Sequence, residues 1–293
     1  MNRIEGIRSW LFGPAHDAAG FAAMLACPAG ALILDLEDFT PPDSRPAARQ
    51  ELAAKVAAGQ GAGKLMAVRI NPLEAGGNAD LDAAMAAGAE VISLPMAETA
   101  AQVMALDAAV ARLERMLGRA MGSVAVLPVC ETALGVAALR RLAGASPRVR
   151  AALLGTEDLA ASLQAGRSRE GLELAPARGR FLLDCRAAGV VPIDAPYTFS
   201  DADGAAAEAR AARALGYHAK ALVRPHHAGA INAALTPSAT DLSTARTRIA
   251  AFEAARARGE DRALVDGLWV ELPTWRAAQR LLAEAGEGPS AAG

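Results

Sequence analysis

The sequence predicts an α/β protein: a (β/α)8 TIM barrel over residues 1–228, followed by a C-terminal helical extension over residues 229–293. Three observations lead to this fold class. Eight short apolar runs recur up to Pro225, most of them are followed by alanine-rich stretches with helical spacing, and the pattern changes after that proline. Continuous apolar strands that alternate with helices indicate a parallel sheet covered on both faces. Eight such units suit a closed barrel better than an open doubly wound sheet, which is the alternative.

The predicted strands follow one another at regular intervals. In order they are SWLFGP (9–14), ALILDLED (31–38), LMAVRIN (65–71), VISLPM (91–96), VAVLPVCET (124–132), AALLGTEDL (151–159), VVPIDAP (190–196) and AKALVRP (219–225). Stretches such as AALRRLAG and AAAEARAARALG lie between them and have the apolar spacing of helices. The alternation therefore predicts eight strand–helix units.

The extension has a different pattern. The stretch TPSATDLSTARTRIAAFEAARARGE predicts a helix, with Asp241 or Ser243 as its N-cap. ALVDGLWVELP predicts a short hairpin, and TWRAAQRLLAEAG predicts a last helix before a disordered EGPSAAG tail. So small a segment cannot bury a core of its own, and we expect it to pack on the barrel or on a neighbouring subunit.

Composition excludes several classes of protein. A net charge of -2 and a pI of about 6.1 give no basic field for nucleic acid or an anionic membrane. No apolar stretch reaches the roughly 18 residues of a membrane span, and the N-terminus lacks the apolar core of a signal peptide. Cys27, Cys130 and Cys185 lack metal-type spacing and indicate a reduced interior. GAGK, at residues 61–64, is no phosphate-binding loop. We expect a soluble, cytoplasmic protein.

Polar residues gather where the predicted strands end. In a barrel the loops at these ends converge on one mouth, where the chemistry takes place. The residues are Asp35, Glu37 and Asp38; Arg69 and Asn71; Glu131; Glu157 and Asp158; Asp194; and Arg224. So many carboxylates around one cavity would repel one another, and a divalent cation resolves that conflict.

Glu131 and Asp158 are the predicted metal ligands. Oxygen-only ligation selects a hard cation, and Mg²⁺ takes one or two carboxylates while leaving positions for water and substrate. Glu131 has a structural alternative, in which backbone amides at the start of the next helix satisfy it. Glu157 is the alternative to Asp158, because neighbours on a strand point in opposite directions.

Arg69 is the predicted binding group for a substrate carboxylate, which its planar fork can hold through two hydrogen bonds. It also has the structural role of neutralising Asp35 or Glu37, and the two roles are compatible. Asp38 is interpreted as a turn cap before two prolines.

Other reactive residues near the strand ends receive no chemical role. His16 and the pair His226 and His227 are interpreted as loop residues, and Met96 as packing. Strand alternation turns Cys130 away from the mouth if Glu131 faces it.

The same stretches resemble the citrate lyase β-subunit-like branch of the HpcH/HpaI aldolase family. RSWLFGP, ALILDLED, VRINPL, ETALGV, LLGTEDLAASL and GVVPIDAPY are similar to its motifs in the same order, over nearly the whole chain. The resemblance implies a (β/α)8 barrel, Mg²⁺ on Glu131 and Asp158, a carboxylate on Arg69, and homotrimers or hexamers whose C-terminal extensions lie across a neighbour's active site.

The resemblance also implies a reaction. Members cleave or form C–C bonds in β-hydroxy acyl-CoA thioesters such as citryl-, malyl- or citramalyl-CoA. We therefore expect a Mg²⁺-dependent lyase, with metal-bound water, Asp35, Glu37 or Glu271 as the base. The alternatives are a thioesterase, a CoA-independent aldolase on a small hydroxy acid, and a non-catalytic subunit of a lyase complex.

Three stretches depart from the family pattern. Strand eight ends in LVRPHH rather than Ile-His-Pro, so that Arg224 stands at the histidine's position. The C-terminal stretch WVELP offers Glu271 where the family often has an aspartate. GPAHDAAGFAAML lacks the basic residue that the family often has where the CoA nucleotide approaches.

Overall fold

A computed structural model describes residues 3–287 of the chain. The chain divides into two compact units, Met1–Leu235 and Thr236–Gly293. The first unit contains a closed barrel of eight parallel strands in sequence order, and β8 pairs with β1. The strands are β1 (Ser9–Pro14), β2 (Ala31–Asp35), β3 (Leu65–Arg69), β4 (Val91–Leu94), β5 (Ala125–Cys130), β6 (Ala151–Leu154), β7 (Val191–Tyr197) and β8 (Ala219–Leu222). The predicted (β/α)8 fold and its eight strands are confirmed.

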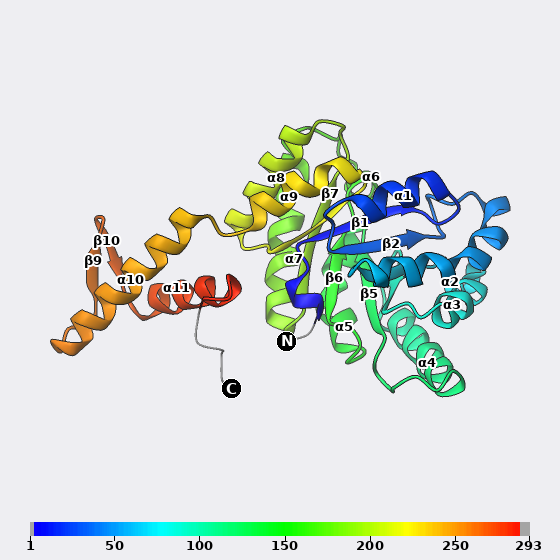
Figure 1. Cartoon of the computed structure of the whole chain (residues 1–293), viewed down its shortest axis with the longest axis horizontal. Helices are drawn as coiled ribbons and strands as arrows, with labels where there is room; N and C mark the ends of the chain where they lie inside the picture. Colours follow the sequence, from blue (N-terminus) through cyan, green and yellow to red (C-terminus); the bar gives the residue numbers. More distant parts are fainter. Residues whose placement is uncertain (1–2, 288–293) are drawn as a thin grey trace. The chain divides into compact units, whose positions relative to one another are not determined.

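Helices follow the strands around the barrel, as the chain from blue to yellow shows in Figure 1. They are α1 (Ala18–Ala26), α2 (Arg45–Gly61), α3 (Gly77–Ala86), α4 (Ala100–Met116), α5 (Ala133–Gly144), α6 (Glu157–Ser162), α7 (Ala175–Ala188), α8 (Ala202–Leu215) and α9 (Ala228–Leu235). Side chains cap three of these helices: Thr99 caps α4, Thr132 caps α5 and Asp201 caps α8. Short 3₁₀ turns lie at Arg3–Gly6, Pro42–Ser44, Leu73–Ala75, Leu172–Leu174 and Pro225–His227.

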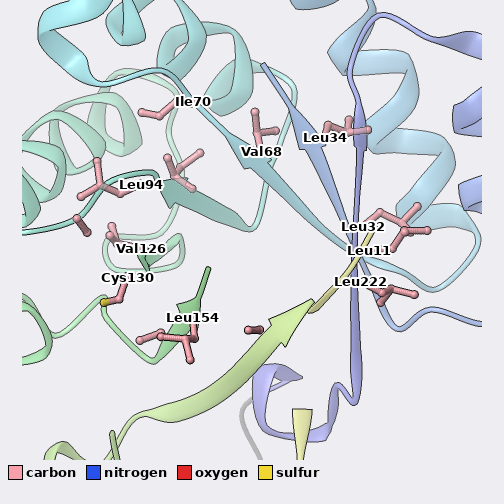
Figure 2. Packing of buried hydrophobic residues seen from close by; sticks show 14 of the residues in the cluster. Leu11, Leu32, Leu34, Val68, Ile70, Leu94, Val126, Cys130, Leu154 and Leu222 are labelled. Atoms are coloured by element: carbon pink, nitrogen blue, oxygen red, sulfur yellow. The ribbon is translucent and has the colours of Figure 1, made fainter. Parts of the chain in front are cut away.

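Strand alternation separates two apolar layers. Side chains such as Trp10, Ile33 and Leu153 fill the inside of the barrel. Their sequence neighbours point outward and pack under the helices, and Figure 2 shows several of these, including Leu34, Leu154 and Cys130. Cys130 is fully buried in this outer layer, and burial raises the pKa of its thiol. The alternation thus turns Cys130 away from the barrel interior.

The second unit contains two helices and a hairpin: α10 (Ala239–Ala257), β9 (Ala263–Val265), β10 (Leu268–Val270) and α11 (Leu272–Glu284). The predicted helices and hairpin are present. The expected N-cap of α10 is wrong: Ser238 is the N-cap, and Asp241 is its capping-box partner, because Asp241 lies three positions inside the helix. Of the seven residues of the predicted tail, 287–293, six lie outside the described residues.

The boundary between the units lies at Thr236, not at residue 229, because α9 packs against α8 as part of the barrel unit. The buried core of the second unit is thin and centres on Ala245, Ala278 and Leu282. Among the described residues, no helix is long and apolar enough to cross a membrane.

Candidate active site

A cavity of about 160 Å³ lies where the strands of the barrel end. Its apolar floor comes from interior positions of the barrel: Phe12, Val129, Leu153 and Val223. Its polar walls come from the residues that follow the strands, namely Asp38, Arg69, Glu131, Glu157 and Asp158. The strand ends therefore bring five of the predicted polar residues to one cavity, as expected for a barrel.

Arg69 ends β3 and is almost fully buried. Asp35, at the end of the neighbouring strand β2, accepts two hydrogen bonds from it: Nε to Oδ1 at 3.0 Å and Nη2 to Oδ2 at 2.5 Å. Glu37 and Asp38 form ion pairs with the other end of the guanidinium, at 2.9 Å from Nη1 and 3.3 Å from Nη2. Asp35 thus fixes the Nε–Nη2 edge, and Glu37 and Asp38 lie at the Nη1–Nη2 edge, so that three carboxylates surround one guanidinium.

Asp35 organises the loop after β2. Besides Arg69, its carboxylate accepts the backbone N–H groups of Glu37 at 2.8 Å and Phe39 at 3.2 Å. Asp35 is fully buried and does not line the cavity. Both of its oxygens are occupied, so its position supports a role in holding Arg69 and this loop in place.

Glu37 lies next to Arg69, but one oxygen of its carboxyl group lacks a hydrogen-bond partner. Its Oε2 lies 2.9 Å from Nη1 of Arg69 but is buried and has no hydrogen bond of good geometry. Burial raises the pKa of Glu37 to about 8, against the lowering effect of Arg69. The side chain therefore exchanges a proton near neutral pH.

Glu131 follows β5 and is held by a strained turn. Its Oε1 accepts the backbone N–H of Met96 at 2.8 Å, and Met96 has a left-handed φ of 45°. That conformation is unfavourable for a side chain with a Cβ and is found where surrounding structure enforces it. Burial raises the pKa of Glu131 to about 7, and the nearby Asp158 adds to this rise. The Met96 side chain is 38% exposed and is therefore not part of the buried core.

Gly155 leaves room for Glu131. A Cβ at position 155 would lie 2.4 Å from the Cβ of Glu131 and 3.2 Å from its Oε2. Only glycine fits there without a shift of Glu131.

Asp158 and Glu157 both line the cavity, contrary to the expectation that only one faces it. The strand β6 ends at Leu154, and the two residues form the first turn of α6, where strand alternation does not apply. Glu157 accepts a hydrogen bond from Thr198 at 2.6 Å and pairs with Arg167 at 3.3 Å. The side chain of Asp158 has no hydrogen bond or ion pair with the residues that the structure describes. Asp158 is thus the freer of the two to bind a ligand.

Other predicted residues lie elsewhere. Asp194 is in the middle of β7, not at its end, and points outward to Arg178 at 2.7 Å and Lys220 at 2.6 Å. Asn71 is buried against Asp80. Their expected place at the mouth is wrong.

Three further groups stay outside the cavity lining. Arg224 is exposed, and Val223 takes the inward position next to it. His226 and His227 both contact the carbonyl of Ser200, and His16 contacts Thr40. Glu271 is the N-cap residue of α11 in the second unit.

Two aromatic rings enclose Arg69, which the sequence reasoning missed. Its Cζ lies 5.2 Å from the ring centroid of Phe12 and 5.7 Å from that of Phe39. Phe39 is half-exposed at the cavity, and its ring contacts that of Phe12 edge-on. The sequence signal for this contact is Phe39, which directly follows the acidic residues Glu37 and Asp38 at the end of the second predicted strand. The rings restrict the plane of the guanidinium and exclude water from its faces.

Replacing Phe39 tests this enclosure. We expect Phe39→Leu to weaken the binding of a carboxylate substrate about three- to tenfold, because leucine has no ring quadrupole to attract the guanidinium. Phe39→Tyr keeps the ring and is the matched control. Steady-state KM values measure the effect; equal KM values for the two variants would contradict it.

Comparison with known proteins identifies the family of the chain. Residues 8–225 match the model of the HpcH/HpaI aldolase/citrate lyase family. The chain is 31% identical over 300 residues to an L-malyl-CoA/beta-methylmalyl-CoA lyase of Cereibacter sphaeroides, covering 95% of this chain and 94% of the relative. It is 32% identical over 282 residues to the citrate lyase subunit beta of Escherichia coli, covering 95% and 93%.

Solved structures show the same architecture. CitE of Mycobacterium tuberculosis, in complex with magnesium, acetoacetate and coenzyme A, matches with a TM-score of 0.74 and 30% identity over 96% of this chain and 98% of that one. A citrate lyase of Burkholderia xenovorans matches in fold with a TM-score of 0.83 at 20% identity over 99% and 97%. The chain belongs to the HpcH/HpaI aldolase/citrate lyase family.

Proposed function

We propose that the protein is a Mg²⁺-dependent carbon–carbon lyase that acts on a β-hydroxy acyl-CoA thioester of the citryl-, malyl- or citramalyl-CoA type. One observation carries this proposal: Glu131, Asp158 and Arg69 line one cavity. The similarity to two CoA-thioester or citrate lyases and to a CitE protein in complex with magnesium and coenzyme A supports it.

Glu131 and Asp158 fit a magnesium ion. The structure describes no group of three or more His, Cys, Asp or Glu side chains that would hold a metal on their own. Two carboxylates are the set that Mg²⁺ uses when water and substrate complete its coordination. The backbone N–H of Met96 binds one carboxylate oxygen of Glu131 and leaves the other for a ligand. The negative charge of Asp158 raises the pKa of Glu131, so a cation between the two carboxylates would relieve their repulsion. When bound, the ion supplies Lewis-acid polarisation of the substrate oxygens and a template for their orientation.

Arg69 would hold the substrate carboxylate. Asp35 fixes the Nε–Nη2 edge of the guanidinium, and an acid would bind the Nη1–Nη2 edge in place of Glu37 and Asp38. Phe12 and Phe39 restrict its plane. The binding group is therefore preorganised, which reduces the entropy lost when the substrate binds.

Glu37 would carry the proton in cleavage: its side chain does not line the cavity, but its Oε2 lies 2.9 Å from Nη1 of Arg69, which does. As the bond between the hydroxyl-bearing carbon and the thioester α-carbon breaks, the hydroxyl proton passes to the Glu37 carboxylate and a 2-oxo acid forms. The electron pair remains on the α-carbon as the thioester enolate, which the proton then neutralises to give the acyl-CoA. Asp35 is the weaker candidate base because its oxygens are occupied by Arg69 and two amides.

The pH profile of cleavage tests this role. A base with a pKa of about 8 is mostly protonated below that pH, so we expect kcat/KM for cleavage to rise through pH 8 and to level off about one unit above it. Glu37→Gln should lower the plateau and remove the rise. An unchanged profile in that variant would assign the base to another group, and metal-bound water, Asp35 and Glu271 are the remaining candidates.

The loop after β1 favours a second candidate, a CoA-independent aldolase with the same site. Between Pro14 and α1 this loop carries His16 and Asp17 but no lysine or arginine for a CoA phosphate. Product analysis with and without Mg²⁺ separates the possibilities. The proposed lyase releases a 2-oxo acid and an acyl-CoA, whereas a thioesterase releases free CoA thiol. An aldolase of the second kind cleaves the free hydroxy acid as well as its thioester. A non-catalytic subunit would turn over none of them alone.

We also propose a homotrimer or hexamer in the cytoplasm. The thin core of residues 236–287 supports association with another surface, since so small a unit gains little stability alone. Three free cysteines support a reducing compartment. Light scattering of the purified protein measures the oligomeric state.

A further inference from the structure

The strand β7 contains an extra residue relative to its neighbour β8. Asp194 pairs with Lys220, but Tyr197, three positions later, pairs with the residue only two positions beyond Lys220. Such a β-bulge reverses the alternation of side chains beyond it, and bulges occur next to active sites, where they redirect a side chain. Pro196, which has no backbone N–H to give to the sheet, lies within this bulge.

The bulge determines which residues of β7 reach the cavity. Ile193 faces the interior of the barrel, but both residues that follow it face the outer layer under the helices. The alternation then resumes in the opposite phase: Pro196 and Thr198 line the cavity, and Tyr197 between them packs outward. Without the extra residue, strand alternation would turn Pro196 and Thr198 away from the cavity.

The bulge also holds the residues that follow β6. Thr156 donates a hydrogen bond to the carbonyl of Pro196 at 2.8 Å, and Thr198 donates one to Glu157 at 2.6 Å. Thr156 directly precedes α6, and Glu157 and Asp158 form the first turn of that helix. The two hydrogen bonds therefore fix the start of α6, which carries the predicted metal ligand Asp158.

Lys220 binds the bulge from the outer face of the sheet. Both of its sequence neighbours face the barrel interior, so its own side chain faces the outer layer, where it is fully buried outside the cavity. Its ammonium group donates hydrogen bonds to the carbonyl of Ala195 at 2.5 Å, to Asp194 at 2.6 Å and to Glu208 at 2.6 Å. All three of its donors are thus used, and the carbonyl at the bulge has a charged partner.

We propose that Lys220 is a positioning residue for the metal site: by binding the carbonyl of Ala195 it holds the bulge of β7, and through the bulge it sets the position of Asp158. This inference rests on the magnesium site proposed above and adds to it a residue that touches neither the metal nor the substrate. The side chain of Asp158 has no hydrogen bond or ion pair of its own among the described residues. The position of its carboxylate therefore depends on where the bulge and Thr156 hold the start of α6.

Arg148 provides a matched control for Lys220. It is also a buried cation that binds two carboxylates, those of Asp107 and Glu114. It also donates a hydrogen bond to a backbone carbonyl, that of Val124 at 3.0 Å. This carbonyl directly precedes β5, at the end of the barrel opposite the cavity. Replacing either cation by methionine removes a buried ion pair, but only Lys220 is connected to the bulge.

Mg²⁺ affinity, measured by calorimetry on the metal-stripped full-length protein, tests the inference. We expect Lys220→Met to weaken Mg²⁺ binding by about 10- to 100-fold, the loss typical of removing a group that orients a metal ligand without touching the metal. Asp194 keeps its two hydrogen bonds from Arg178 in this variant, so its charge stays compensated. Arg148→Met should lower the melting temperature but leave Mg²⁺ affinity unchanged. Equal Mg²⁺ affinities in the two variants overturn the inference and leave the lyase function standing. If the unmodified protein binds no Mg²⁺, the proposed function fails and the inference with it.

Thr156→Val tests the same connection without removing a charge. The Thr156 side chain makes no capping hydrogen bond to α6, so valine, which has the same shape, removes its hydrogen bond to Pro196 and keeps the helix start. We expect Mg²⁺ affinity to fall in Thr156→Val, and to fall little further when Lys220→Met is added, because both changes act through the bulge. Losses that add in full would contradict a shared connection. If Lys220→Met does not fold, Thr156→Val decides alone, and an unchanged Mg²⁺ affinity overturns the inference.

Discussion

Glu131→Gln is expected to lower Mg²⁺-dependent turnover by roughly 100- to 1,000-fold, the loss typical of removing one group that stabilises charge in a transition state. Glutamine has nearly the same shape and can still accept the Met96 N–H through its amide oxygen. The variant therefore keeps the turn after β4 but loses the negative charge that a cation needs. Turnover and Mg²⁺ affinity, measured by calorimetry on the metal-stripped protein, should fall together.

Residues Glu157 and Asp158 provide the matched control. They are adjacent on α6 and line the same cavity, but Glu157 is bound by Thr198 and Arg167 whereas Asp158 has no such partner among the described residues. Asp158→Asn should weaken Mg²⁺ binding as Glu131→Gln does, and Glu157→Gln should leave it nearly unchanged. If Glu157→Gln loses Mg²⁺ affinity and Asp158→Asn does not, Glu157 is the metal ligand in place of Asp158. Full Mg²⁺-dependent turnover in Glu131→Gln would refute its proposed role.

The sequence predicts the barrel and much of its mouth because both depend on strand periodicity. Eight apolar runs without strong polar breaks define strands that are buried on both faces. The residue that ends a run then falls at the mouth, as Arg69 and Glu131 do. Alternation also separates Cys130 from Glu131 correctly. All of these features follow from strand alternation, in which successive side chains point to opposite faces.

Asp194 shows where the same reasoning fails. The predicted strand ended at Pro196, but β7 continues to Tyr197, so Asp194 lies inside the sheet, opposite Lys220 in the register. Because Ile193 faces the interior, Asp194 must face outward, where Arg178 and Lys220 neutralise it. The charged Lys220 within an apolar run was a signal that a buried partner exists.

The missed contacts of the site depend on loop conformation. Met96 takes a left-handed φ, and Phe39 reaches Arg69 only because Asp35 binds the amides of the loop between them. Asp158 faces the cavity together with its neighbour because α6 begins there. None of these features follows a periodic pattern, so each needs the three-dimensional structure.

Arg69→Lys is expected to reduce kcat/KM by roughly 30- to 5,000-fold, corresponding to about 2–5 kcal/mol for truncating one partner of a buried, hydrogen-bonded charge pair. Lysine keeps the positive charge but cannot bind Asp35 through one edge and a substrate carboxylate through the other. The ammonium also lacks the flat faces that Phe12 and Phe39 enclose. Most of the loss should appear as weaker binding of the acid, measured by calorimetry with oxaloacetate, pyruvate and glyoxylate in Mg²⁺.

The same variant separates binding of the acid from binding of the metal. Arg69 contacts Asp35, Glu37 and Asp38, and its positive charge lowers the pKa of Glu131. Lysine keeps that positive charge. If the metal site requires only the charge at position 69, the affinity for Mg²⁺ should change far less than the affinity for the acid. Arg167→Lys is the matched control, because Arg167 also pairs with carboxylates and lies over an aromatic ring but does not line the cavity. A large loss of acid affinity in Arg167→Lys, with little in Arg69→Lys, would place the carboxylate at the other arginine. Equal thermal stability of the two variants would show that the loss at Arg69 reflects substrate binding and not unfolding around the uncompensated Asp35.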